Sequence, residues 1–350
     1  MANNLFTLHS DMTQSAFTRE SLVAGKLCTD YEFTGAKTVK ILTPVTVPMN
    51  DYQRSGTNRY GNPTEMQDII QELTLTQDRS FALTIDKGND ADQGYAKNAG
   101  KMLMLQIAER AVPEFDRYVL NKLAHKAGII AAAGEALTKE NICERISEAT
   151  AKLDDMEVPA YDRMLFVSTQ GYKMLKHSDE FMAVQELGRE ALAKGVVGSY
   201  DNMEVIKVPA TRWPENVNFM IVHKNAATAP VKMSETKLHK DPPGISGHLL
   251  EGREYYDCFV FGPRAWGVYA EADTASGKGS VCAVPVISAQ GAISSTTQDA
   301  VIFYTTDGSD PRYSATAVQG TAAGAVAGTT VKAYAHKEGS FDSAVAEKTF

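Results

Sequence analysis

Residues 73–127 read LTLTQDRSFALTIDKGNDADQGYAKNAGKMLMLQIAERAVPEFDRYVLNKLAHKA, and their hydrophobic period changes after Gly88. Before that glycine, apolar residues alternate with polar ones at Leu73, Leu75, Phe81, Leu83 and Ile85. This alternation predicts a long strand with one buried face. Beyond residue 90, apolar residues recur every four positions at Leu103, Ile107, Ala111, Phe115 and Val119. The second spacing predicts the buried face of a helix of about 35 residues, over 91–127, kinked at Pro113.

A second alternating segment lies upstream, with Val39 and Ile41 as its apolar positions, and it predicts another long strand. Residues 48–71, between the two strands, contain several Pro, Gly and Asn residues and no core pattern. Two patterned strands joined by a long unpatterned segment predict a protruding β-hairpin. We therefore expect residues 48–71 to make contacts between subunits, and their deletion to spare the folded monomer.

The rest of the chain up to Ala272 alternates between short helices and strands. A helix is expected from Thr138, with an apolar face made of Ile142, Ile146, Ala149 and Leu153. A shorter helix is expected over 170–176, and strands are expected over 164–167, 205–208, 219–222, 259–261 and 266–269. Residues 1–34 lack sustained periodicity and indicate an extended arm with one short helix near 13–24. The fold class is therefore mixed α+β.

A change of composition near Cys282 marks the start of a separate C-terminal domain. From Ala283 to Phe350, 36 of 68 residues are Ala, Ser, Thr or Gly. The small residues 274–280 indicate a flexible linker. Alternation at Val301, Phe303 and Thr305 leads into an Asp-Gly turn signal, and a late strand alternates at Val331, Ala333 and Ala335. These patterns predict a small β-sandwich that folds alone.

Composition excludes several classes of protein. The 350 residues are 43% hydrophobic and 22% charged, which is normal for a globular protein, and the net charge is −8. An acidic surface argues against a protein that clamps nucleic acid with its whole surface. We expect no secretory signal and no membrane span. The four cysteines are far apart, so we expect buried free thiols rather than a zinc site or a disulfide framework.

No catalytic constellation emerges from the motifs. Gly277-Lys278-Gly279 lacks the remainder of a phosphate-binding loop, and the seven histidines never form a metal-binding helix motif. The Gly244–Gly247 segment lacks the spacing of a nucleophile elbow. Asp154-Asp155 is expected to be a solvated helix end, and Cys143 and Cys258 are expected to be structural. The chain is therefore expected to be neither an enzyme nor a cofactor-binding or metal-binding protein.

Cationic and aromatic side chains on the hairpin and its root are the candidates for inter-subunit contact. They are Lys37, Lys40, Arg54, Arg59 and Tyr60. Such charges can meet an acidic surface of another chain, or they can simply keep a loop soluble. The long arm and hairpin favour the first interpretation, because a monomer would not recover the conformational entropy lost in ordering them.

The order of these parts resembles the major capsid proteins of tailed phages, which have the Hong Kong 97-like fold. The similarity is carried by residues 73–86, by residues 162–176, and by the closing stretches 222–227, 252–257 and 266–269. The resemblance implies the following division of the chain: N-terminal arm 1–34, extended hairpin loop 35–88, spine helix of the peripheral domain 89–133, axial domain 134–241, return to the peripheral domain 242–272, linker 273–282, and immunoglobulin-like domain 283–350.

The C-terminal segments 301–311 and 328–335 resemble the immunoglobulin-like module found at the C-terminus of chitobiase-type proteins. That resemblance suggests a host-associated glycan as ligand, with Tyr304, Tyr313 and Tyr334 either stacking on it or lying in the core. Asp307 and Asp310 are expected to cap backbone groups rather than to bind calcium. The domain is expected to project from the outer surface of a shell and to be dispensable for assembly.

The resemblance implies a major capsid protein of a tailed double-stranded DNA phage. Hexamers and pentamers of the chain would close into an icosahedral shell around the genome, assembled in the host cytoplasm and located in the virion. A portal protein and a separate scaffolding protein are the expected partners. The short arm leaves no room for a fused scaffold, so assembly would need a separate scaffold or none. No covalent crosslink between subunits is expected. The alternatives are an encapsulin-like compartment shell and a glycan-binding surface protein.

Overall fold

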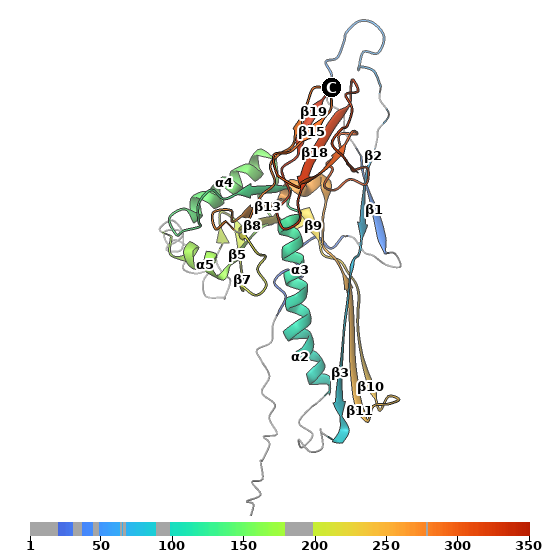
Figure 1. The fold of residues 1–350 in the computed structure, drawn as a ribbon, viewed down its shortest axis with the longest axis vertical. Helices are drawn as coiled ribbons and strands as arrows, with labels where there is room; N and C mark the ends of the chain where they lie inside the picture. Colours follow the sequence, from blue (N-terminus) through green and yellow to red (C-terminus); the bar gives the residue numbers. More distant parts are fainter. Residues whose placement is uncertain are drawn as a thin grey trace, which may run out of the picture.

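The computed structural model describes residues 20–30, 37–44, 49–63, 65, 68–88, 99–178, 199–277 and 279–350. Most of the predicted arm, most of the expected helix at 13–24 and the first residues of the predicted long helix lie outside these ranges. The described chain forms a central body with an elongated extension, and the C-terminal domain lies at the opposite end from that extension (Figure 1).

A six-stranded mixed sheet forms the centre of the body, in the order β4-β13-β8-β5-β7-β6. Its strands are β4 (Ile129–Ala132), β5 (Arg163–Ser168), β6 (Ser199–Tyr200), β7 (Met203–Val208), β8 (Val217–His223) and β13 (Val268–Ala272). Helices α4 (Ile142–Asp155) and α5 (Thr169–Lys176) accompany it. The strands predicted at 164–167, 205–208 and 219–222 and both predicted helices are confirmed, and α4 begins at Ile142 rather than at Thr138.

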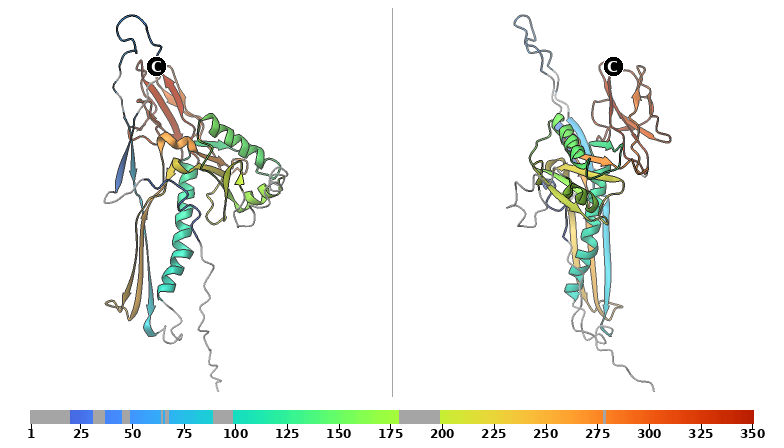
Figure 2. Two further views of the ribbon diagram at one scale, coloured as in Figure 1. Left: turned by 180° about the vertical axis from the view of Figure 1, so that it is seen from behind. Right: turned by 90° about the vertical axis from the view of Figure 1, so that its left-hand side faces the viewer.

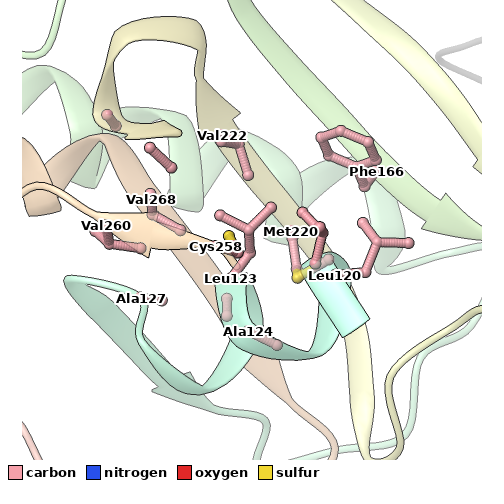
Figure 3. Packing of buried hydrophobic residues seen from close by; sticks show 14 of the residues in the cluster. Leu120, Leu123, Ala124, Ala127, Phe166, Met220, Val222, Cys258, Val260 and Val268 are labelled. Carbon is pink, nitrogen blue, oxygen red and sulfur yellow. The ribbon is translucent and has the colours of Figure 1, made fainter. Parts of the chain in front are cut away.

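Both faces of this sheet are covered, which explains why its central strands β5 and β8 are buried at almost every position and are apolar at most of them. Leu165 and Val167 of β5 pack with Ile146 of α4 on one face. Phe166 of β5 packs on the other face with Leu120 of the long helix (Figure 3). Successive residues of β5 therefore point to opposite faces of the sheet, and each face has its own apolar core.

The long helix consists of α2 (Ala99–Gln106), a π-helical turn (Ile107–Ala111) and α3 (Val112–His125). The π turn ends two residues before Pro113, where the sequence predicts a kink, and the Val112 amide bonds to the Ile107 carbonyl. Proline has no N–H and its ring crowds the preceding turn, so a wider turn at this point accommodates it.

The predicted buried face of this helix is only half right. Leu103, Ile107, Ala111 and Phe115 are half-buried. Complete burial occurs nearer the C-terminal end, at Val119, Leu120, Leu123 and Ala124. The reason is that only the end of α3 crosses the six-stranded sheet, whereas α2 runs beside the elongated extension (Figure 1).

That extension is a three-stranded antiparallel sheet of β10 (Val231–Lys240), β11 (Gly247–Tyr256) and β3 (Gln77–Asp86). The boundary between axial and peripheral domains predicted at residue 241 falls in the turn between β10 and β11, so the sheets do not divide the chain there. The strand expected at 266–269 is also corrected, because a 3-10 helix (Gly262–Gly267) occupies its first half and β13 joins the central sheet.

The hairpin loop pairs β1 (Thr38–Pro44) with β2 (Asp68–Thr74). The single strand predicted over 73–85 is wrong, because β2 ends at Thr74 and β3 starts at Gln77 in a different sheet. The hairpin's unpatterned segment also ends earlier than expected, since β2 begins at Asp68 rather than after Gln71. A short pair, β9 (Ala227–Thr228) and β12 (Phe259–Val260), lies beside this hairpin's base.

The C-terminal domain is all-β, as predicted. A four-stranded sheet has the order β17-β16-β18-β19, and β14 pairs with β15. The strands are β14 (Val286–Ile287), β15 (Ile293–Ser294), β16 (Val301–Thr305), β17 (Val318–Gln319), β18 (Thr330–His336) and β19 (Ala346–Thr349). Val331, Ala333 and Ala335 are buried as expected, but on β16 Ile302 rather than Phe303 enters the core.

Candidate assembly interface

The hairpin loop and the C-terminal domain leave the body at the same end (Figure 1), and they diverge in the right-hand view of Figure 2. The loop tip, residues 49–63, is structured by its own hydrogen bonds. The Gln53 amide donates to the Arg59 carbonyl at 3.0 Å, and the Gly61 amide donates to the Asn58 carbonyl at 2.9 Å. The loop therefore presents a defined surface rather than a featureless coil.

That surface carries large apolar side chains with little cover from the described part of the chain. Tyr60 is 87% exposed and Met49 is 98% exposed. Tyr60 packs edge-to-face against Tyr52 with ring centroids 5.0 Å apart. Aromatic and Met side chains are enriched where one protein surface meets another. The tip is therefore suited to bind a second polypeptide.

The five predicted contact residues fall into two groups. Arg54, Arg59 and Tyr60 lie together in the tip, where Arg59 Nε donates to the Gly56 carbonyl at 3.3 Å. Lys37 and Lys40 lie at the root, and Lys40 Nζ pairs with Glu72 Oε1 across the hairpin at 2.6 Å. The structure thus brings the three tip residues together and leaves the two lysines apart from them.

A buried amide, missed in the sequence, holds the root of the loop. Gln71 is 8% exposed although it falls in the segment without a core pattern. Its Nε2 donates to the Val260 carbonyl, and its Oε1 accepts from the Gly262 amide, each at 2.9 Å. Leu73 and Leu75 are fully buried directly after it. The loop consequently projects from a fixed base.

Asp257 explains why β2 and β3 are separate strands. Its Oδ2 accepts from the amide and the hydroxyl of Thr76, at 2.9 and 2.8 Å. Its Oδ1 accepts from the Tyr118 hydroxyl at 2.6 Å. Burial and this hydrogen bond raise the pKa of Tyr118 above its ordinary value. The chain thus turns from one sheet into the other where Thr76 is tied to the long helix.

The described end of the N-terminal arm is anchored by Asp116, a fully buried carboxylate on α3. It accepts from the Ser21 hydroxyl at 2.5 Å and from the Leu22 amide at 2.9 Å. Arg212 donates to it at 2.6 Å and also bonds to the Glu20 carbonyl. Sequence reasoning missed this anchor because Asp116 lies between Glu114 and Arg117 like an ordinary surface charge, and its side-chain partners Ser21 and Arg212 are about 95 residues away along the chain.

Asp154 and Asp155 are exposed at the end of α4, as expected. Asp154 also accepts from the buried Arg163 at 2.6 Å. Arg163 also donates to the carbonyls of Val158 and Pro159. The side chain of Arg163 thereby provides hydrogen-bond donors for main-chain carbonyls in the segment that links α4 to β5.

The linker and the C-terminal domain differ from expectation, because the domain is docked on the body. The Asp273 amide bonds to the Asn216 carbonyl at 2.8 Å, and the Cys282 amide bonds to the Phe341 carbonyl at 3.0 Å. Phe341 is buried in the main core and stacks on His125 with centroids 4.7 Å apart. Residues 274–280 therefore do not separate two independently moving parts.

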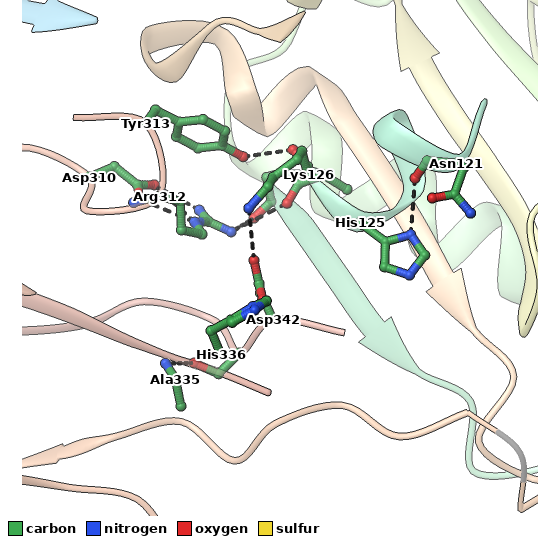
Figure 4. A network of polar contacts seen from close by, with 12 residues as sticks. Asn121, His125, Lys126, Asp310, Arg312, Tyr313, Ala335, His336 and Asp342 are labelled. Atoms are coloured by element: carbon green, nitrogen blue, oxygen red, sulfur yellow. Dashed lines mark hydrogen bonds and ion pairs between the residues drawn. The ribbon is translucent and has the colours of Figure 1, made fainter. Parts of the chain in front are cut away.

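Three tyrosines considered for glycan stacking have internal roles. Tyr313 donates to the Lys126 carbonyl at 2.8 Å (Figure 4). Tyr334 is 7% exposed and stacks on Phe303, and Tyr304 packs against the core of the domain. Burial raises the pKa of both Tyr313 and Tyr334. These residues do not form an exposed stacking platform.

Acidic residues of the domain act as turn caps, as expected. Asp307 accepts from the amide and hydroxyl of Ser309 and from the Thr316 hydroxyl, and these bonds lower its pKa although burial opposes them. Asp310 pairs with Arg312 at 2.7 Å. Within the described residues no group of three metal-ligating side chains occurs. All four cysteines are buried free thiols.

Among the described residues, no helix combines the length and hydrophobicity that a membrane span requires.

A known protein family matches part of the C-terminal domain. The chitobiase/beta-hexosaminidase C-terminal domain family matches residues 287–347. No curated protein sequence matches the chain.

Solved structures match the larger part. A chain of Mycobacterium phage Che8 is 18% identical, with a TM-score of 0.63, over 77% of this chain and 98% of that chain. The capsid structure of cyanophage P-SCSP1u is 12% identical, with a TM-score of 0.62, over 77% and 93%. The mature capsid of bacteriophage PhiM1 is 12% identical, with a TM-score of 0.59, over 77% and 92%. The chain therefore has the Hong Kong 97-like fold of tailed-phage capsid proteins, followed by an immunoglobulin-like domain similar to the chitobiase C-terminal domain.

Proposed function

We propose that this chain is the major capsid protein of a tailed double-stranded DNA phage, a structural subunit without catalytic activity. The observation that carries the proposal is the match of more than nine-tenths of each of three phage chains to about three-quarters of this one. Two of those structures are capsids by name. The exposed loop tip supports the proposal, because its apolar side chains gain from burial against a neighbouring copy.

In the proposed shell, hexamers and pentamers of the chain enclose the genome, and a portal and a separate scaffold take part in assembly. Arg54, Arg59 and Tyr60 contact a neighbouring subunit, while Lys37 and Lys40 lie at the loop's base. The net charge of −8 suits an interior that encloses DNA without gripping its phosphates. Assembly takes place in the host cytoplasm, and the product is the virion.

The test is expression of the full chain, alone and with a candidate scaffold, followed by sedimentation and negative-stain imaging. We expect closed particles. A Tyr60→Ala/Arg59→Ala variant should remain folded by circular dichroism but lose particles, whereas Lys173→Ala, an exposed change on α5, should assemble normally. A chain that stays monomeric under all these conditions contradicts the proposal. Particles that contain a cargo protein instead of DNA support an encapsulin-like compartment.

A further inference from the structure

We propose that residues 310–315 of the C-terminal domain lock the root of the extended loop to the end of the long helix, so that this domain sets the position of the loop. The importance of that position for shell assembly rests on the proposed function. The lock itself is a property of the single subunit.

The first contact of residues 310–315 is with the C-terminal end of α3. Arg312 Nη1 donates to the carbonyls of Gly128 and Ala127, at 2.9 and 3.3 Å. The Tyr313 hydroxyl donates to the Lys126 carbonyl at 2.8 Å (Figure 4). Lys126 is the C-cap residue of α3, and Ala127 and Gly128 follow it directly. Side chains from about 185 residues further along the chain therefore supply hydrogen-bond donors to main-chain carbonyls at and just beyond the end of the helix.

Arg312 is buried at this position, and its charge is paired within the domain. Its side chain is only 3% exposed, and Asp310 pairs with it at 2.7 Å. The guanidinium also lies near the rings of Trp266 and Tyr313, with centroid distances of 6.0 and 5.3 Å. A buried arginine whose charge is paired and whose donors reach backbone carbonyls has a defined geometry. It holds the domain in one orientation on the body.

The second contact is with the loop root. The Ala315 amide donates to the Ile70 carbonyl of β2 at 3.3 Å. Tyr313 also packs against Gly262, where an added Cβ would lie 3.0 Å from the Tyr313 Cβ. Gly262 is the residue whose amide bonds to Gln71, the neighbour of Ile70. Residues 310–315 thus touch β2 directly and through Gly262.

A second set of contacts also holds the C-terminal domain on the body. Phe341 is inserted in the main core, and Asp342 pairs with Lys126 Nζ at 3.3 Å and with His336 Nδ1 at 2.6 Å. The domain is therefore held at two places on the end of α3. Residues 310–315 therefore stay in contact with the loop root.

The loop depends on such support because β1 and β2 form a sheet of only two strands. An isolated two-stranded hairpin is marginally stable in water. Its order must come from contacts at the root, and the C-terminal domain supplies some of them. Loosening the domain should therefore loosen β1 and β2 without affecting the six-stranded sheet.

Hydrogen exchange on the unassembled full-length subunit tests the inference. The variants are Arg312→Ala and Tyr313→Phe, and the control is Lys332→Ala, which removes an ion pair with Glu347 within the same domain. In both variants we expect amides of β1 and β2 to exchange at least about tenfold faster, with unchanged exchange in β5 and β8. The control should match the native chain.

Unchanged exchange in β1 and β2 of both variants overturns the inference. If Arg312→Ala also exposes the amides of β18, that variant has unfolded the domain, and Tyr313→Phe, which removes a single hydroxyl, decides alone. Because the measurement uses free subunits, its outcome is independent of whether the chain forms shells.

Discussion

At the scale of single residues, buried polar side chains tie down the segments that lie outside the central sheet. Asp116 holds the end of the arm, Gln71 holds the loop root, and Asp257 holds the junction of β2 and β3. Each bonds to main-chain groups that have no ladder partner at that point. Leaving such groups unpaired in the interior costs about 1–3 kcal/mol each, so these side chains decide where the irregular segments lie.

Asp116→Ala should be strongly destabilising. The change leaves the buried Arg212 without its carboxylate partner and releases Ser21 and Leu22. Removing one member of a buried ion pair costs about 3–5 kcal/mol. Urea unfolding of the subunit measures the loss. The matched control is Arg117→Ala, an exposed change at the next position, which should stay within about 0.5 kcal/mol. Equal stability of the two variants contradicts the anchor.

His223 should make the subunit less stable in mild acid. Its side chain is buried, and burial lowers the pKa of the imidazole below its ordinary value of 6.5. Between the two pKa values the unfolded chain binds more protons, so the free energy of unfolding falls as the pH drops below about 6.5. Urea midpoints at several pH values should show this slope.

His223→Asn should flatten the slope, because it keeps an acceptor for the Asn225 amide without a titrating ring. His177→Asn, at an exposed histidine after α5, is the control and should retain the native slope. A native slope that persists in His223→Asn assigns the effect to other groups.

At the scale of elements, the long helix has two environments. The end of α3 lies in the main core, whereas α2 and the π turn run beside the three-stranded sheet with half-buried apolar residues and the exposed Met104. An apolar cavity of about 370 Å³ adjoins Ala111, Val112 and Phe115. The apolar repeat continues through both environments, so it indicates the helix but not the depth of burial.

Leu123→Ala should therefore cost more than Phe115→Ala. Leu123 is fully buried, and its truncation should lower the free energy of unfolding by about 2–5 kcal/mol. Phe115 is half-buried and packs edge-to-face on Tyr256 with centroids 5.1 Å apart, so its truncation should cost about 1–3 kcal/mol. Denaturant unfolding of both variants compares them. The reverse order would show that the core lies elsewhere along the helix.

The loop tip should be separable from folding, but the loop root should not. Replacing residues 49–63 with Asn-Gly should leave the stability of the monomer within about 0.5 kcal/mol, because in the described structure all of these residues except the half-buried Gly61 are exposed. Particle formation should be lost.

Gln71→Ala should instead destabilise the monomer by about 1–3 kcal/mol, because the Gly262 amide and the Val260 carbonyl lose their partner. Calorimetry and imaging separate the two effects, and normal shells from the tip variant contradict its role.

At the scale of the whole molecule, two folds are joined into one subunit by contacts and not by the linker alone. The phage-like body and the C-terminal domain share Phe341 in one core and the Arg312 network on one helix end. Parts that share buried surface and charge-assisted hydrogen bonds unfold together more readily than parts on a tether.

Differential scanning calorimetry of the native chain should accordingly show one cooperative transition. Arg312→Ala should divide it into two, because the body and the domain then unfold separately, while Lys332→Ala should keep one. Two transitions already present in the native chain would show that docking contributes little stability.

The sequence by itself determined the long helix, several of the strands and the division into a mixed body and an all-β C-terminal domain. Periods of two and four residues indicated strands and the long helix. The Asp-Gly pair indicated a turn, and its Gly308 has a φ of +76°. The change of composition located the C-terminal domain. Those features depend on residues close together in the chain, so local sequence patterns are enough to predict them. Only the tertiary structure decided the break at Thr76, the burial of Gln71, the Asp116–Arg212 pair and the docking by Arg312. Each of these joins residues far apart in the chain, and a local period shows which face is apolar without showing what covers it.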